Sequence, residues 1–340
     1  MSTSEPTGTV DRGKYPDART PWEQPAWRES VRAWVRERLA EHGLRDQGPW
    51  RVRLRPWSVL VRIEVGLARP VWFKASPPAG AFEAGLTAAL AHWVPGQVLA
   101  PLAVDTDRGW SLLPDGGPLF AELLDRHPAD PRAWEEVLRQ YAVLQRTVAP
   151  HLAELTRLGV PTARTAELPA HFDRLVTGNT ALQPAERAAL LAHRPQLLAE
   201  CAELQAAGIA DSLDHADLHA SQLFAPAPGR FVFFDWGDAA LTHPFLSFLV
   251  PARAAAERHG AAVLPRLRDA YLEPWTGDGH RPAELRRALA LADRLADLGR
   301  ATAWGRLFPR AYPAGGDNGA AEAARSLLRL LDGGGAGPGH

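Results

Sequence analysis

The stretch DHADLHASQLF, residues 214–224, places two aspartates and two histidines within six positions. Carboxylates and imidazoles are the side chains that most often move protons or bind metals in enzymes. An aspartate in a loop can also cap a helix, but no helical pattern follows DHADLH for Asp217 to cap. The stretch is therefore a candidate for a catalytic or metal-binding loop.

A β-hairpin is predicted directly after this loop. The runs QLF (222–224) and FVFF (231–234) flank the turn APAPGR, which is rich in proline and glycine. Folding the hairpin brings Gln222 and Asp235 to the same end, with Asp217 on the loop before it. Two carboxylates and an amide oxygen suit Mg²⁺, which prefers oxygen ligands and leaves its other positions to phosphates and water. The sequence therefore predicts a magnesium site and a phosphorylated substrate.

The use of lysine singles out one further position. Of the 38 basic residues, only Lys14 and Lys74 are lysines. Lys14 belongs to a polar amino-terminal arm, whereas Lys74 ends the apolar run PVWFKA. A compact ammonium differs from the broad guanidinium fork in shape and hydration, so arginine is not an equivalent choice there. We therefore expect Lys74 to be a site residue.

The loop and hairpin together resemble a known signature. HADLHASQLF is similar to the H-G-D-x-H-x-x-N motif of the aminoglycoside phosphotransferase and choline kinase-like family, relatives of the protein kinases, and the resemblance extends over residues 50–308. It implies that Asp217 is the catalytic base. It also implies that Gln222, in the asparagine position, and Asp235 bind the metal.

The same resemblance implies a nucleotide-binding set in the first part of the chain. Lys74 corresponds to the strand lysine that holds the α- and β-phosphates, with Glu83 as its ion-pair partner. Leu113 lies in LLPDGG (112–117), which resembles the hinge whose backbone meets adenine. Ser58, at the first hairpin tip, is expected to contact phosphates.

Four further residues near the motif receive supporting roles. We expect His215 to brace the loop by hydrogen bonds and His219 to line the cleft. Trp236 is a candidate for support or for stacking on a substrate ring. Asp238 either assists the metal or the substrate, or closes a turn.

Three departures from the family pattern bear on activity. Ala216 replaces the glycine after the first histidine, a small change. Gln222 replaces asparagine, as in the maltokinase-like branch of the family, which points toward sugar acceptors. Pro56, Trp57 and Ser58 stand where kinases have a glycine-rich loop, so we expect modest nucleotide affinity.

The resemblance implies a small-molecule kinase, an enzyme that transfers the γ-phosphoryl group of ATP or GTP to a hydroxyl of a sugar, aminoglycoside or similar metabolite, with Mg²⁺ as cofactor. Two alternatives remain. The chain could be a kinase-like binding module with weak or no activity. It could also be a zinc-dependent hydrolase, because His215, Asp217 and His219 alternate along one strand face.

The elements around these residues segregate by type. A packing helix is predicted first, then an order β-β-β-α-β-β, and after residue 117 almost only helical periodicity. In the second part only 222–224 and 230–234 read as extended. Strands first and helices after indicate an α+β protein. Together with the resemblance, this predicts a two-lobed protein-kinase-like fold with a small antiparallel-sheet N-lobe and a mainly helical C-lobe.

The predicted domain limits follow from composition. Residues 1–20 and 332–340 are rich in Gly, Pro, Ser and Thr and are expected to be disordered. The N-lobe is expected over 21–114, and the helical C-lobe, with the catalytic loop and metal hairpin, over 115–331.

Charge and composition narrow the choice of partners. The 38 basic and 39 acidic residues give a formal charge of -1, which argues against a nucleic-acid or anionic-membrane partner. No apolar run is long enough for a membrane span, and Cys201 is the single cysteine, so no intramolecular disulfide can form. We expect a cytoplasmic monomer or homodimer that acts on a small molecule bearing a hydroxyl.

Overall fold

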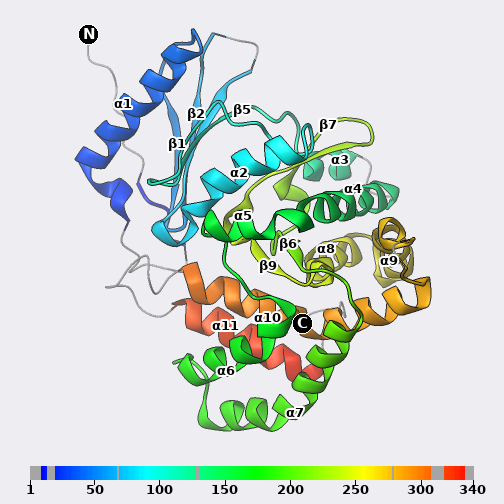
Figure 1. Ribbon diagram of the computed structural model, residues 1–340. Coiled ribbons are helices and arrows are strands. Elements are labelled where there is room, and N and C mark those ends of the chain that lie inside the picture. The colour runs from blue at the N-terminus through cyan, green and yellow to red at the C-terminus, as the bar shows by residue number, and fades with distance from the viewer. Residues whose placement is uncertain are drawn as a thin grey trace. The chain divides into compact units, whose positions relative to one another are not determined.

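The computed structural model describes residues 9–13, 20–66, 69–126, 131–277, 279–307 and 318–333. It divides the chain into two compact units (Figure 1). The N-terminal unit comprises residues 1–116 and 306–318, and the helical unit comprises residues 117–305 and 319–340. No helix in the described residues combines the length and apolar character that a membrane span requires.

The N-terminal unit is built on one five-stranded antiparallel sheet. Its order is β1-β2-β3-β5-β4, and it carries α1 on one face and α2 on the other (Figure 1). The elements are β1 (Arg51–Arg55), β2 (Ser58–Ile63), β3 (Val71–Ala75), β4 (Ala103–Asp105), β5 (Trp110–Pro114), α1 (Pro25–Glu41) and α2 (Phe82–Trp93). The predicted β-β-β-α-β-β order is therefore confirmed.

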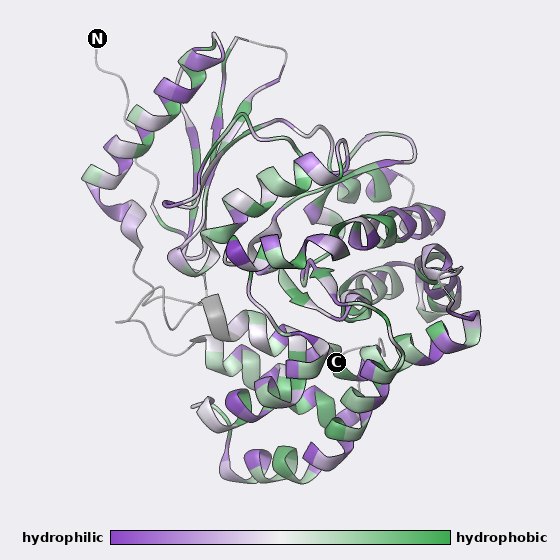
Figure 2. Ribbon diagram, in the orientation of Figure 1, coloured by the Kyte–Doolittle hydropathy of each residue, from purple (hydrophilic) through white to green (hydrophobic). Residues whose placement is uncertain are grey.

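Strand alternation decides which face of this sheet is core. Phe73 is fully buried and packs edge-on against Trp34 of α1 and Trp110 of β5, with ring centroids 6.0 and 5.8 Å away. Successive strand residues point to opposite faces, so Lys74 faces α2. Figure 2 shows that α1 carries both hydrophobic and hydrophilic residues, as expected of a helix that packs one face on the sheet. The apolar alternation therefore orients Lys74 toward the helix that carries Glu83.

The chain termini differ in part from expectation. Residues 1–8, 14–19 and 334–340 of the segments predicted to be disordered lie outside the described residues. Residues 9–13, by contrast, pack on the sheet, since Val10 is buried in its core and the Asp11 N–H donates to the Leu54 carbonyl at 2.9 Å. Ion pairs from Asp11 to Arg55 and from Arg12 to Glu23 add to these contacts, and composition alone revealed none of them.

The helical unit surrounds two small sheets. Its helices are α3 (Phe120–Arg126), α4 (Arg132–Val148), α5 (Leu152–Arg157), α6 (Leu168–Gly178), α7 (Pro184–Ala206), α8 (Leu249–His259), α9 (Leu264–Leu272), α10 (Pro282–Leu307) and α11 (Asn318–Arg329). The predicted hairpin is β7 (Leu223–Ala227) with β8 (Arg230–Phe233). A second antiparallel pair, β6 (Ser212–Asp214) with β9 (Ala240–Thr242), was not predicted. Both of its strands are three residues long and buried throughout, so they show no alternation.

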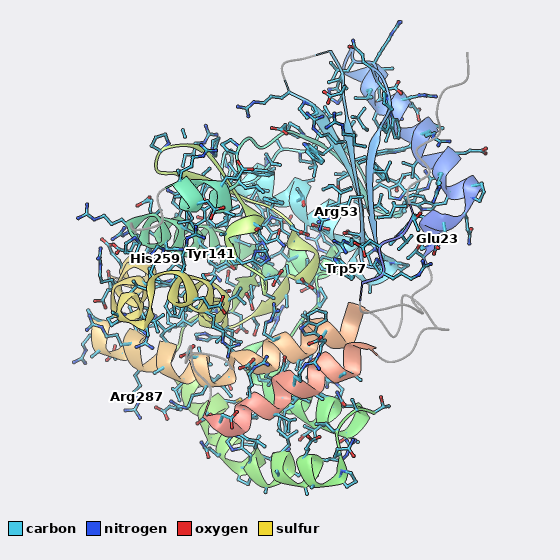
Figure 3. The ribbon with its side chains drawn as sticks, turned by 180° about the vertical axis from the view of Figure 1, so that it is seen from behind. Glu23, Arg53, Trp57, Tyr141, His259 and Arg287 are labelled. Carbon is cyan, nitrogen blue, oxygen red and sulfur yellow. The ribbon has the colours of Figure 1, made fainter. Side chains whose placement is uncertain are left out.

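Side chains from α4 hold β6 in the interior of the helical unit. The Gln145 amide donates to the Leu213 carbonyl at 2.9 Å. The Tyr141 hydroxyl accepts the His215 N–H at 2.8 Å, and Tyr141 lies inside the unit (Figure 3). These bonds fix the backbone on both sides of Asp214.

Asp214, the last residue of β6, completes this hydrogen-bond network. Its Oδ1 accepts the Ala216 N–H at 2.7 Å and the Ser247 hydroxyl at 2.6 Å. Ser247 in turn lies 3.1 Å from the Tyr141 hydroxyl. Burial raises the pKa of Asp214, because removal from water disfavours the charged form. The Asp214 carboxylate therefore stabilises the fold as a hydrogen-bond acceptor, while its buried negative charge lowers the free energy of unfolding.

Two substitutions at Asp214 should therefore have different effects on stability. Asp214→Asn keeps an oxygen for both bonds and removes the buried charge, so we expect the free energy of unfolding at pH 7 to be equal or higher. Asp214→Ala leaves the Ala216 N–H and the Ser247 hydroxyl unpaired and should lower it by roughly 1–3 kcal/mol per lost acceptor. Urea unfolding of both variants measures this.

The pH dependence provides the control. A raised folded-state pKa means that the wild-type carboxyl adds stability when protonated and loses it as pH rises through that pKa. The advantage of Asp214→Asn should therefore disappear at acidic pH, where wild-type Asp214 is protonated too. Equal losses for the Asn and Ala variants at pH 7 would contradict this account.

Candidate active site

Asp217 lies on the loop between β6 and β7, directly after a residue with left-handed backbone. Ala216 has φ +61, a conformation that costs an L-residue roughly 1–2 kcal/mol and that glycine adopts freely. The hydrogen bond from the Ala216 N–H to Asp214 helps to hold it. A methyl group is thus tolerated where the family signature has glycine.

Three side chains surround the Asp217 carboxylate. Arg300 of α10 donates from Nη1 to Oδ1 at 3.0 Å. Oδ2 lies 3.4 Å from His219 Nε2 and 3.5 Å from Gln222 Nε2, both long for hydrogen bonds. Oδ1 is therefore firmly held, whereas Oδ2 keeps capacity to accept another proton donor.

The charge of Asp217 is set by the same neighbours. Burial alone would raise the pKa of this carboxyl, but the hydrogen bond to His219 and the positive charge of Arg300 outweigh it and lower the pKa to about 2. Asp217 is consequently ionised at neutral pH. It can accept a hydrogen bond from a hydroxyl but is a weak base.

His219 has a defined proton position. Its Nδ1 accepts the Ser221 N–H at 3.2 Å, so the ring proton sits on Nε2 and faces Asp217. The hydrogen bond to Asp217 raises the pKa of His219 despite partial burial.

His215 and Trp236 pack beneath the loop. His215 is buried and donates from Nε2 to the Phe234 carbonyl at 2.8 Å, and its ring centroid lies 4.7 Å from that of Trp236. Trp236 is fully buried. The interpretation of Trp236 as a surface for substrate stacking is therefore wrong, and its contacts are those of loop support. His215 makes the bracing hydrogen bond that we expected.

The β7–β8 hairpin brings the two expected metal ligands together. Leu223 pairs with Phe233, and the Phe234 N–H donates to the Gln222 carbonyl at 3.3 Å. Asp235 follows at once with φ +66, and the negative charge on Asp235 contributes to the raised pKa of His219. Asp217, Gln222 and Asp235 thus gather at one end of the hairpin. Asp238 ends the short 3₁₀ turn that follows, Trp236–Asp238.

The donor chemistry at this end suits a hard cation. Because the Gln222 amide nitrogen faces Asp217, its Oε1 is left without a hydrogen-bond partner among the residues described. That oxygen and the Asp235 carboxylate provide the one or two protein ligands typical of Mg²⁺ in phosphate-binding sites. The residues present therefore fit a magnesium ion.

They do not fit the zinc alternative. Within the described part of the chain, no three His, Cys, Asp or Glu side chains cluster closely enough to hold a metal. His215 already uses Nε2 for the Phe234 carbonyl. The set His215, Asp217 and His219 therefore does not form a zinc site.

In the N-terminal unit, Lys74 and Glu83 form an ion pair. Lys74 Nζ lies 2.5 Å from Glu83 Oε1, and the side chains are only 14% and 6% exposed. The Ser76 hydroxyl donates to the other oxygen, Glu83 Oε2, at 2.7 Å. The pair fixes the ammonium between β3 and α2. Its role in nucleotide binding stays a prediction.

The other two predicted nucleotide contacts lie on strands of this unit. Ser58 begins β2 and pairs with Arg55 across the two-residue turn Pro56–Trp57. Leu113 pairs with Trp72 near the end of β5 and is partly exposed. Neither position contradicts the prediction.

Sequence reasoning missed Arg300. It is 83 residues beyond Asp217, on a helix rich in arginine, and no spacing rule connects the two. The fold alone reveals the contact, because α10 returns beside the loop within the helical unit.

Neither a protein-family model nor a curated protein sequence matches this chain. Solved structures do. A macrolide 2'-phosphotransferase from Brachybacterium faecium is 17% identical with a TM-score of 0.53, covering 91% of this chain and 98% of its own. A choline kinase from Streptococcus pneumoniae is 10% identical with a TM-score of 0.54, covering 89% and 99%. An amicoumacin kinase in complex with AMP-PNP and Ca²⁺ is 12% identical with a TM-score of 0.57, covering 86% and 90%.

At these identities the similarity speaks for the fold. The matches span 90% or more of each of these solved structures. The α+β, kinase-like fold class predicted from the sequence is confirmed. The chain has the fold shared by the aminoglycoside phosphotransferase and choline kinase-like proteins.

Proposed function

We propose that this protein is a small-molecule kinase, which transfers the γ-phosphoryl group of ATP or GTP to a hydroxyl of a sugar, aminoglycoside or similar metabolite. One observation carries the proposal. An ionised Asp217 with one oxygen held and one available lies beside Gln222 and Asp235, whose oxygens suit Mg²⁺. The solved structures of the same fold are named as a macrolide 2'-phosphotransferase and a choline kinase, which supports the same class of reaction.

In this proposal Asp217 orients the acceptor. Its Oδ2 accepts a hydrogen bond from the acceptor hydroxyl and aims the oxygen at the γ-phosphorus. The new O–P bond forms as the bond from the γ-phosphorus to the β-bridging oxygen breaks, the nucleoside diphosphate leaves, and the hydroxyl proton passes to Asp217. With a pKa of about 2, Asp217 takes the proton late, which matches the loose transition state of phosphoryl transfer. Its main contribution is therefore orientation.

The remaining charges act on the nucleotide phosphates. Asp235 and Gln222 would hold Mg²⁺, which would supply neutralisation of the phosphate charge. The ammonium of Lys74, fixed by Glu83, binds the α- and β-phosphates. Ser58 and Leu113 serve as further nucleotide contacts.

For the acceptor we propose only the functional group that receives the phosphoryl group, a hydroxyl. The matched structures are named for a macrolide, choline and amicoumacin, so one fold accommodates chemically different acceptors. Gln222 in the asparagine position favours a sugar, through the resemblance to the maltokinase-like branch.

A kinase-like binding module is the second candidate. The β1–β2 tip consists of Pro56 and Trp57, and proline lacks an N–H, so the tip offers few backbone donors to phosphates. Such a protein would bind nucleotide without transferring its phosphoryl group.

Asp217→Ala and Asp217→Asn test the proposed mechanism. Both remove the acceptor of the substrate proton, so we expect kcat to fall by about 10²–10⁴-fold. Nucleotide affinity should stay near the wild-type value, because Asp217 contacts the acceptor. A screen of metabolite hydroxyls with labelled ATP gives kcat, and titration calorimetry gives the affinity. Wild-type turnover in either variant would remove Asp217 from the mechanism.

Lys74→Met should raise the nucleotide KM about tenfold or more, since a buried ammonium is lost opposite Glu83. Lys74→Arg should not restore it, because the guanidinium has a different shape and binding geometry. Lys14→Met, which alters the only other lysine, is the matched control and should behave like wild type. An unchanged KM in Lys74→Met would exclude Lys74 from nucleotide binding.

Mg²⁺-ATP should raise the thermal midpoint of the wild type, because a ligand that binds only the folded state stabilises it. Asp235→Asn should lose this shift, whereas Asp269→Asn, on the surface of α9, should keep it. A shift in the wild type without consumption of ATP with any acceptor would favour the binding module over the kinase.

A further inference from the structure

Arg300 stands apart from the other arginines of α10. It donates from Nη1 both to the backbone carbonyl of Ala216 and to Asp217 Oδ1, the latter at 3.0 Å. Arg294, two turns earlier on the same helix, binds Glu200 at 2.8 Å instead. Arg300 thus joins α10 by hydrogen bonds to the loop that carries Asp217.

These two hydrogen bonds constrain both the backbone position and the side-chain rotamer of Asp217. The bond to the Ala216 carbonyl fixes the backbone just before Asp217, and the bond to Oδ1 fixes how the carboxylate is turned. Asp217 and Arg300 are 24% and 23% exposed, so bulk water screens the contact only in part. Both bonds leave from Nη1, so one nitrogen of Arg300 ties the Ala216 carbonyl to the Asp217 carboxylate.

The consequence concerns the other carboxylate oxygen. With Oδ1 occupied, the oxygen that can receive the acceptor hydroxyl is Oδ2, whose contacts to His219 and Gln222 are 3.4 and 3.5 Å. Without Arg300 the carboxylate could rotate and present either oxygen. Small misplacements of a reacting group cost large factors in rate.

We propose that Arg300 is a positioning residue, which acts through Asp217 by holding Oδ1 and leaving Oδ2 as the atom that receives the acceptor proton. This rests on the proposed kinase function for its effect on rate. Its effect on the structure of the loop does not depend on that function.

The kinetic test uses Arg300→Met, Arg300→Lys and, as matched control, Arg294→Met. Arg300→Met should lower kcat about 10²-fold with the nucleotide KM unchanged, because orientation of the acceptor is lost while nucleotide contacts remain. Arg300→Lys should recover part of the rate, and millimolar guanidinium should partly rescue Arg300→Met. Arg294→Met should match wild type. A lower kcat with no rescue by lysine or guanidinium would show a merely structural role.

A double-mutant cycle tests whether Arg300 works through Asp217. In the Asp217→Asn background, the further change Arg300→Met should alter the residual rate by no more than about twofold, because its target is already gone. If the two losses multiply instead, Arg300 acts on its own and the proposal is overturned.

Crystal structures of wild type and Arg300→Met provide a test that needs no activity. The proposal expects Asp217 to change rotamer or to occupy two in the variant, with thermal stability sufficient for crystals. An unchanged Asp217 carboxylate overturns it, whatever the kinetics. If the wild type and Arg294→Met transfer phosphate to no acceptor while Asp217 still moves, the kinase function fails and the positioning role stands.

Discussion

A polar loop can cross an apolar interior only where hydrogen bonds replace the water it loses, and the helical unit is organised around that constraint. Tyr141 and Gln145 of α4 meet the backbone of β6, and Asp214 and Ser247 close the network. The loop that carries Asp217 leaves this fixed point. The start of the loop is therefore fixed by hydrogen bonds inside the helical unit.

One local contact and one distant in sequence set the pKa of the Asp217 carboxyl. Burial pushes the pKa of Asp217 upward, and a histidine in the loop and an arginine from α10 push it further down. The hairpin adds Gln222 and Asp235 through backbone pairing. In the N-terminal unit the charge on Lys74 is balanced by one contact, the ion pair with Glu83. This contact follows from local structure, because strand alternation points Lys74 toward the helix that carries Glu83.

Features formed by residues close together in the sequence were predicted, whereas contacts between residues far apart in the sequence were missed. The hairpin after the catalytic loop, the sheet meander and the lysine on β3 follow from alternation, turn residues and residue choice, all of which are local. The pair β6–β9 is too short and too buried to show a pattern, and Trp236 lies beside a motif but points into the core. Arg300 meets Asp217 only because α10 returns to the loop, so no local rule could identify it.

Two non-glycine residues in the described chain have left-handed backbone: Ala216, which precedes Asp217, and Asp235, one of the expected metal ligands. Each stores strain that the surrounding packing must outweigh, which means the bend exists before any ligand arrives. Association then need not pay the entropy of ordering a floppy segment. At position 216 the backbone disfavours β-branched residues and the burial of Ala216 excludes large ones, so the shape of the loop limits which residues can replace it.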